Sequence, residues 1–183
     1  MKILVFGANG MAGHMVALYL KEQGYDVTGF VKKKNNLFHC VEGNALDSNQ
    51  IKELLQTEQY DFVINCIGIL NKAVDVNLAE GIYVNSVLPH LLEECVRDKN
   101  TKVIHISSDC VFSGRKGHYR ESSHPDADSY YGKTKALGEL LEGEKSLTLR
   151  TSIVGPELKN DGIGLFHWFM SQQGLVNGFT EVI

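Results

Sequence analysis

The first residues of the chain constrain its fold most strongly. Lys2–Phe6 is a short apolar run, and three evenly spaced glycines follow it at Gly7, Gly10 and Gly13. Over Met11–Gln23 apolar residues recur at helical spacing, so this segment predicts a buried strand, a tight turn and the start of a helix. Such glycines let a backbone approach a pyrophosphate, to which the helix N-terminus offers free N–H groups. The plainer alternative is a turn that only packs the helix against the strand.

Strands and helices alternate along the rest of the chain. Strands are predicted where short apolar runs end in turn residues, and helices where apolar residues recur every three or four positions. The predicted strands are Lys2–Phe6, Asp26–Val31, Phe38–Val41, Asp61–Ile67, Lys102–Ser107 and Ser146–Val154. The later predicted helices are one containing Ile51, Leu54 and Leu55, then Glu80–Val96 with a candidate kink at Pro89, and Tyr130–Leu141. We therefore expect an α/β protein with a Rossmann-type doubly wound parallel sheet and helices on both faces.

The character of the chain changes after Pro156. We expect residues 1–155 to form an NAD(P)-binding Rossmann domain, and residues 156–183 to begin a substrate-binding region that this sequence contains only in part. Glu157–Gly164 is predicted to be a loop, and Leu165–Gln173 a short helix rich in aromatic residues. Aromatic residues so close to a terminus predict a continuation that would bury them.

Composition and charge narrow the class of partner. The 183 residues are 43% hydrophobic and 22% charged, as is ordinary for a soluble globular protein. A net charge of −4 disfavours nucleic-acid binding, which needs a basic surface. The apolar run before Gly7 is too short for a signal peptide or a membrane span.

The four cysteines are dispersed, at Cys40, Cys66, Cys95 and Cys110, and form no Cys-x-x-Cys pair. A disulfide framework or a metal site is therefore not expected. A reducing cytoplasm is the compartment that this cysteine usage favours.

The end of the second predicted strand bears on the choice of dinucleotide. An acidic residue there would bind the ribose 2′-hydroxyl of NAD, but this chain has Phe30 and Val31 followed by three lysines that begin at Lys32. Lysines suit the 2′-phosphate of NADP, so NADP(H) is preferred over NAD(H). The alternative is a solvated basic loop with no ligand.

A serine, a tyrosine and a lysine follow the glycine-rich turn in an order that suits carbonyl reduction. Tyr131 and Lys135 are four residues apart, so on a helix both face the same side, and Ser108 ends an apolar run upstream. Negative charge grows on the substrate oxygen during reduction, and donors aimed at that oxygen stabilise it. We expect Tyr131 to be the general acid, Ser108 to be a second donor, and Lys135 to hold the nicotinamide ribose and stabilise ionised Tyr131. Tyr130 competes with Tyr131, since it forms an i,i+3 pair with Lys133.

Several segments resemble the extended short-chain dehydrogenase/reductase family, and within it the dTDP-4-dehydrorhamnose reductase branch. The matching segments are Gly-Ala-Asn-Gly-Met-Ala-Gly (7–13), Asp-Phe-Val-Ile-Asn-Cys-Ile-Gly (61–68), Val-Asp (74–75), Ala-Glu (79–80), Val-Asn (84–85), Ile-Ser-Ser-Asp-Cys-Val-Phe-Ser-Gly (106–114), Tyr-Gly-Lys-Thr-Lys-Ala-Leu-Gly-Glu (131–139) and Leu-Arg-Thr-Ser-Ile-Val-Gly (149–155). They occur in the family's order and cover nearly the whole chain.

The resemblance implies a role for each matching residue. Ser108 takes the place of the branch's usual threonine, and Tyr131 and Lys135 keep their catalytic and cofactor-binding roles. The implied cofactor contacts are Gly7, Asn9, Gly10 and Met11 at the pyrophosphate, Asn44 and Ala45 beside the adenine, and Cys66, Ile67 and Gly68 along the central part. The family also normally continues well beyond residue 183, in a portion that closes over a sugar nucleotide.

One departure from the wider superfamily separates the possible activities. Dehydratases usually have Asp-Glu after the catalytic Ser or Thr, whereas here Cys110 follows Asp109, so simple carbonyl reduction is favoured. The resemblance implies an NAD(P)H-dependent reductase of a nucleotide-linked 4-keto-6-deoxysugar, serving surface-polysaccharide precursor synthesis. Two alternatives stay open, an epimerase that recycles its cofactor and a cofactor-binding regulatory subunit that partners a methionine adenosyltransferase. A homodimer is a further open alternative.

Overall fold

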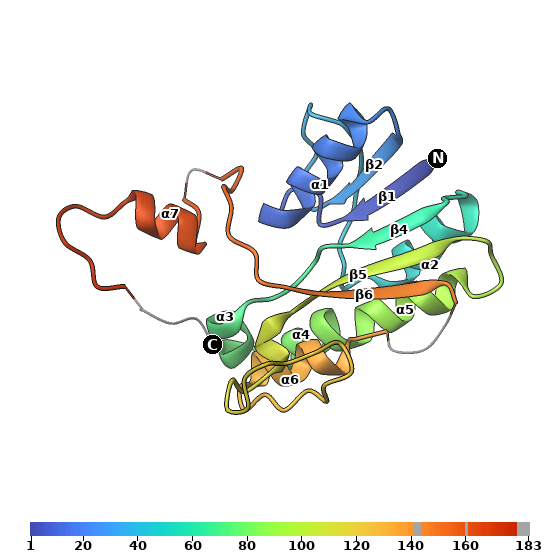
Figure 1. Ribbon diagram of the computed structural model, residues 1–183. Coiled ribbons are helices and arrows are strands. Elements are labelled where there is room, and N and C mark those ends of the chain that lie inside the picture. Colours follow the sequence, from blue (N-terminus) through green and yellow to red (C-terminus); the bar gives the residue numbers. More distant parts are fainter. Residues whose placement is uncertain (141–143, 160, 179–183) are drawn as a thin grey trace.

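The computed structural model describes residues 1–140, 144–159 and 161–178. Its centre is a six-stranded parallel sheet with the strand order β3-β2-β1-β4-β5-β6 (Figure 1). The strands are β1 (Lys2–Phe6), β2 (Asp26–Val31), β3 (His39–Glu42), β4 (Phe62–Asn65), β5 (Lys102–Ser108) and β6 (Ser146–Thr151). The predicted Rossmann-type α/β fold is therefore confirmed, and each predicted strand is present within a few residues of its expected bounds.

Helices connect most successive strands and lie on the two faces of this sheet, whereas the last helix, α7, follows β6. They are α1 (Met11–Glu22), α2 (Ser48–Thr57), α3 (Asn71–Val76), α4 (Leu78–Ile82), α5 (Leu88–Val96), α6 (Tyr130–Leu137) and α7 (Leu165–Met170), with a π-helical turn η1 (Tyr83–Val87) and a 3₁₀ turn η2 (Asp109–Val111). Asp47 caps α2 as its position predicts, because its carboxylate accepts hydrogen bonds from the N–H groups of Asn49 and Gln50.

Side chains alternate between the two faces of the sheet and form two separate cores. On one face Leu4 and Phe6 of β1 pack with residues of α2 and α5, such as Leu55 and Leu92. On the other face Ile3, Val5, Val27 and Ile64 pack with Ala17 of α1. Helices thus cover both faces, as the near-continuous apolar strands require.

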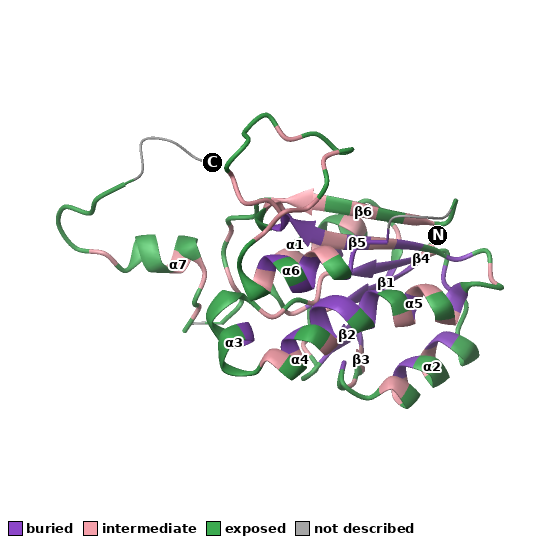
Figure 2. Cartoon of the chain, turned by 90° about the horizontal axis from the view of Figure 1, so that it is seen from below, coloured by how far each residue is buried: buried purple, intermediate pink, exposed green. Residues whose placement is uncertain are grey.

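The coverage is uneven around β6. Leu147 and Leu149 of this strand are 51% and 39% exposed, and they alternate with Thr148 and Arg150, which bond to Leu140 and Glu139 after α6. Helix α7 lies apart from the sheet (Figure 1), and all of its apolar residues are at least 40% exposed. Figure 2 shows the same contrast between the buried strands and the exposed α7.

Residues 80–96 are helical as predicted, but they do not form one uninterrupted α-helix. Residues 78–96 form α4, the π-helical turn η1 and α5 in succession, with Pro89 in the first turn of α5. Proline has no N–H to donate to the carbonyl four residues earlier, here that of Asn85. Helix α6 approaches this carbonyl closely, since a Cβ at Gly138 would lie 1.9 Å from it.

Two other helix predictions need correction. Helix α6 ends at Leu137 and not at Leu141, because Gly138 caps it; Leu141 itself lies outside the described residues. Helix α3 was not predicted at all. Among the described residues, no helix is long and apolar enough to cross a membrane.

Candidate functional site

The strand order reverses between β1 and β4, and this is where open parallel sheets bind ligands. Gly7 follows β1 in a left-handed conformation, with φ of 74°, which glycine adopts without strain. A Cβ at Gly13 would lie only 2.1 Å from the Gly7 carbonyl oxygen, so the first turn of α1 packs directly on the glycine turn. The predicted strand, turn and helix are all present.

The first turn of α1 is open to a ligand. Gly10 precedes the helix, and no side chain in the described residues caps the N–H groups there. An anion can therefore accept hydrogen bonds from them. Met11 faces the segment after β6, since its side chain lies within 4 Å of where a Cβ at Gly155 or Gly164 would be.

The segment after β4 lies against the same turn. A Cβ at Gly7 would meet the Ile67 side chain at 2.8 Å, and the Cys66 N–H donates to the Phe6 carbonyl at 3.1 Å. Burial raises the pKa of the Cys66 thiol to about 12. Gly68 lies next to the Asn85 side chain, which bonds both backbone groups of Ile69 at 2.9 Å.

Asn85 is a residue whose role the sequence did not reveal. Its side chain also donates to Thr134 Oγ1 on α6 at 3.1 Å, so it ties the segment after β4 to the helix that carries Tyr131 and Lys135. Asn85 is fully buried. A fully buried amide inside an apolar helical run is the signal that could have identified it.

The residues expected at the adenosine end lie near one cavity of about 550 Å³. Its lining residues are Lys32, Glu42, Gly43, Asn44, Leu46 and Gln50. Asn9 lies nearby and holds the lysine loop, because its Nδ2 donates to the Lys33 carbonyl at 2.7 Å. Ala45 does not line the cavity, since it is buried in the core with α2 and α5.

Glu42 was not expected in this place. Glu42 is the last residue of β3, one strand away from the end of β2, where an acidic residue would bind the ribose of NAD. Its carboxylate accepts a hydrogen bond from the Lys34 N–H at 3.3 Å. The cavity therefore carries both signs of charge, Lys32 and Glu42.

Ser108 and Tyr131 come together at the end of β5. Gly132 makes this possible, because a Cβ there would lie 2.2 Å from the Cys110 carbonyl oxygen and would push α6 away from η2. Burial raises the pKa of Tyr131, and the interaction of its hydroxyl with the Ser108 side chain lowers it in part. The Ser108 hydroxyl also accepts a hydrogen bond from the Cys110 N–H at 3.1 Å.

Lys135 lies one turn further along α6 and is only 3% exposed. Its ammonium donates to the Ile106 carbonyl at 2.7 Å, and its Nζ lies 3.4 Å from Nε2 of His105. Burial lowers the pKa of Lys135 to about 8, while Glu139 and Cys66 act against that shift. Besides burial, the groups that shift the pKa of Tyr131 are Ser108, Cys110 and Asp109.

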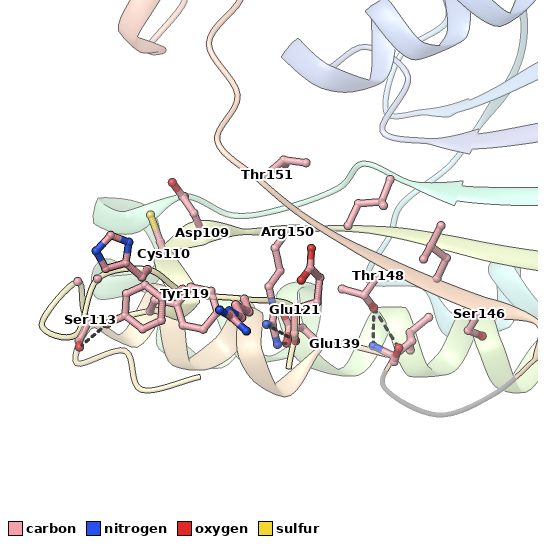
Figure 3. A pocket seen from close by; sticks show the side chains of 18 residues that line it. Asp109, Cys110, Ser113, Tyr119, Glu121, Glu139, Ser146, Thr148, Arg150 and Thr151 are labelled. Carbon is pink, nitrogen blue, oxygen red and sulfur yellow. Dashed lines mark hydrogen bonds and ion pairs between the residues drawn. The ribbon is translucent and has the colours of Figure 1, made fainter. Parts of the chain in front are cut away.

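A larger cavity of about 980 Å³ runs along β6 beyond Asp109 and Cys110 (Figure 3). Arg150 and Glu139 face one another there in a bidentate ion pair, with both N···O distances at 2.8 Å. The pair balances both charges inside the protein. Within residues 1–140, 144–159 and 161–178, no group of three or more His, Cys, Asp or Glu residues could hold a metal ion.

The geometry fits a dinucleotide. The glycine turn packs closely against α1 and the segment after β4, and an open helix N-terminus adjoins it. Ser108 lies at the carboxyl end of β5, two strands away from β1 on the same edge of the sheet. The site residues expected from the sequence thus lie along one edge of the sheet, apart from Ala45.

Curated relatives are similar over most of this chain. A probable low-salt glycan biosynthesis reductase, Agl14 of Haloferax volcanii, is 33% identical over 76% of the chain and 48% of its own length. The beta subunit of methionine adenosyltransferase 2 of Xenopus laevis is 30% identical over 84% of the chain and 47% of its own length. A dTDP-4-dehydrorhamnose reductase of Aggregatibacter actinomycetemcomitans is 29% identical over 87% of the chain and 54% of its own length. The chain thus spans about half the length of the curated relatives it matches.

Solved structures agree with this grouping. A hypothetical dTDP-4-dehydrorhamnose reductase from Sulfolobus tokodaii has a TM-score of 0.74 and 25% identity, over 82% of this chain and 55% of its own. A UDP-glucuronic acid 4-epimerase from Bacillus cereus, in complex with UDP-glucuronic acid and NAD, has a TM-score of 0.65 and 26% identity, over 75% of this chain and 50% of its own.

A family model matches nearly the whole chain, and the relatives and solved structures agree with it. The fold and the relatives place the chain in a superfamily of nucleotide-sugar reductases and epimerases. Residues 1–173 match the RmlD substrate binding domain, and the chain belongs to that family.

Proposed function

We propose that the chain is the cofactor-binding part of an NADP(H)-dependent reductase of a nucleotide-linked 4-keto-6-deoxysugar, serving surface-polysaccharide precursor synthesis. The observation that carries this proposal is the close approach of α6, which carries Tyr131 and Lys135, to the chain just after Ser108, at the same edge of the sheet as the glycine turn. The similarity to dTDP-4-dehydrorhamnose reductases supports the choice of substrate class.

Tyr131 supplies the proton in the proposed reaction. Its raised pKa keeps the phenol protonated at neutral pH, as a general acid requires. Ser108 offers a second hydroxyl to the substrate oxygen, on which negative charge grows. Lys135, still mostly charged at pH 7 with a pKa of about 8, holds the ribose and stabilises the phenolate once the proton has left. The bound nicotinamide supplies the hydride.

The remaining chain residues position the dinucleotide. Gly7, Asn9, Gly10 and Met11 hold the pyrophosphate at the start of α1, and Cys66, Ile67 and Gly68 lie along the central part. Lys32 and Asn44 border the adenosine, and the basic loop at Lys32 favours NADP over NAD. Glu42 opposes that preference, since a carboxylate repels a 2′-phosphate.

The domain division, the location of the sugar site and the oligomeric state belong to the same proposal. Residues 1–155 form the dinucleotide-binding domain and residues 156–183 begin the substrate-binding region, which includes α7. The nucleotide sugar would bind between the two in the cytoplasm, and the active protein would be a homodimer.

Two other functions each have a specific observation in their favour. The similarity to a UDP-glucuronic acid 4-epimerase supports an epimerase, in which the cofactor is recycled. The similarity to a methionine adenosyltransferase subunit supports a cofactor-binding subunit. The presence of Ser108, Tyr131 and Lys135 together favours the reductase over the latter.

The test is to give the full-length protein NADPH and a panel of nucleotide-linked 4-ketosugars. A reductase consumes one NADPH for each sugar converted. An epimerase converts sugar without consuming NADPH, and a regulatory subunit binds the cofactor but converts no sugar. Either of the last two outcomes overturns the proposal.

A further inference from the structure

A buried row of polar side chains leads from the end of β4 to Lys135. Asn65 and His105 are each 0% exposed, and they lie on the neighbouring strands β4 and β5 at paired positions. No role was assigned to either residue from the sequence. Asn65 contacts His105, and His105 in turn contacts Lys135, a residue of the proposed reaction.

The orientation of the Asn65 amide is fixed by the backbone. The Ile67 N–H can only donate, and it donates to Asn65 Oδ1 at 3.1 Å. The amide nitrogen Nδ2 therefore points the other way, toward His105 Nδ1 at 3.1 Å. Because Nδ2 can only donate, Nδ1 of His105 must accept.

This acceptor role decides the tautomer of His105. Burial, with the nearby charges of Lys135 and His90, lowers the pKa of His105 to about 3, so the ring is neutral at pH 7. A neutral imidazole that accepts at Nδ1 carries its proton on Nε2. That N–H lies 3.4 Å from Nζ of Lys135.

An ammonium has no lone pair, so it cannot accept a hydrogen bond from this N–H. A neutral amine can accept it, and in either form Nζ can donate to the Ile106 carbonyl. The charged and titratable groups that act on Lys135 from other positions are Glu139, which follows the end of α6, and Cys66 after β4, and both raise the pKa of Lys135. Arg150 and Ser107 hold the Glu139 carboxylate, which moderates its effect.

We infer that Asn65 and His105 are positioning residues that set the protonation state of Lys135, because Asn65 selects the His105 tautomer that directs an N–H at the lysine amine. The inference rests on the proposed function for its catalytic meaning, in which the charge of Lys135 stabilises the phenolate of Tyr131. The hydrogen-bond pattern itself does not depend on that function.

The test follows the Lys135 side chain by NMR in the 183-residue chain, without cofactor or substrate. The ¹³Cε signal is titrated with pH in the unmodified chain, in Asn65→Leu and in the control Thr28→Val, which removes a buried hydroxyl on β2. Asn65→Leu allows His105 to change tautomer and direct an Nε2 lone pair at Lys135. The pH midpoint of the Lys135 titration should therefore rise by about one unit, because that corresponds to the free energy of about one hydrogen bond. Thr28→Val should leave the midpoint unchanged. A midpoint that does not move in Asn65→Leu overturns the inference.

A second measurement needs no substitution, which matters if Asn65→Leu fails to fold. The ¹⁵N signals of His105 in the unmodified chain report which ring nitrogen carries the proton. A proton on Nε2 supports the inference, and a proton on Nδ1 or on both nitrogens overturns it. Neither measurement involves reduction of a sugar, so failure of the proposed function leaves this result standing, and the reverse also holds.

Discussion

Single residues decide whether the switch point can hold a dinucleotide. Gly13 allows α1 to begin in contact with the Gly7 carbonyl, where a Cβ would be 2.1 Å away from the oxygen. That distance is far below any normal contact, and the neighbour is backbone, which cannot move aside cheaply. The glycine turn is therefore required by the packing itself.

Replacing Gly13 with alanine should separate α1 from the turn. We expect the free energy of unfolding to fall by about 1–3 kcal/mol, because overpacking strains the backbone, and dinucleotide affinity to fall at least tenfold. Urea unfolding and calorimetric titration with NADPH measure the two effects. Gly155→Ala is the matched control, since a Cβ there meets Met11 at an ordinary 3.9 Å. Equal behaviour of the two variants would contradict the packing role of Gly13.

For single residues, the sequence predicted contacts between residues close together in the chain better than contacts between different helices and strands. The spacing of Tyr131 and Lys135 predicted a shared helix face, and both side chains do point toward β5. The contacts of Lys135 with Ile106 and His105 depend on the register of α6 against β5, which no local pattern encodes. Glu42 was missed for the same reason, because it reaches the cavity from β3.

At the scale of elements, the lysine loop after β2 and the end of β3 border one cavity. We expect both to determine the relative affinity for NADPH and NADH. Replacing Lys32 and Lys33 with alanine should weaken NADPH binding roughly tenfold or more while changing NADH binding little, because only NADPH carries the 2′-phosphate. Glu42→Gln, which removes the opposing charge, should strengthen NADPH binding. Titrations of each variant with both cofactors measure these changes. Equal losses for NADPH and NADH would remove the reason to favour NADP.

The segment that follows α6 is joined to β6 by the ion pair of Glu139 and Arg150. The Glu139 side chain is fully buried, so Glu139→Gln leaves the Arg150 guanidinium without its charge partner. We expect a loss of about 3–5 kcal/mol in the free energy of unfolding. The double variant Glu139→Gln, Arg150→Met should lose less, since it leaves no unpaired charge. Urea unfolding decides, and a double variant that is less stable than the single one would contradict this account.

The strands were more predictable than the helices. The central strands β1, β2, β4 and β5 are short, mostly apolar runs that pair in parallel on both sides, so their sequence and their environment agree. The π-helical turn within residues 78–96 was less predictable from the sequence, because it depends on the loss of one hydrogen bond at Pro89 and on the approach of α6. Helix α3 has only six residues, too few to show a period.

At the scale of the whole molecule, two cores enclose a sheet that contains a buried neutral histidine. The pKa of His105 is lowered from 6.5 to about 3, so between these pH values the unfolded chain binds a proton that the folded chain does not. Stability should therefore be full above pH 6.5 and fall as the pH drops toward 3. Urea unfolding against pH should show a shallower fall in His105→Gln. His39→Gln, at an exposed position, should keep the slope of the unmodified chain, and an unchanged slope in His105→Gln would contradict the buried neutral state.

Leu147, Leu149 and the aromatic residues of α7 are exposed, and the chain spans about half the length of the curated relatives it matches. In the proposed function the dinucleotide binds within residues 1–155, and the sugar specificity is expected to come from outside them. Cofactor binding is therefore testable in this chain, and turnover in the full-length protein.

The central claim is that Tyr131 gives the proton in a cofactor-dependent carbonyl reduction, and the most direct test compares the full-length protein with its Tyr131→Phe variant. Turnover is followed as NADPH oxidation with a nucleotide-linked 4-ketosugar, and NADPH affinity is measured by titration of the same preparations. The account predicts a loss of about 10²–10⁴ in turnover with NADPH affinity nearly unchanged, because only the proton donor is removed. Turnover equal to that of the unmodified protein would contradict it.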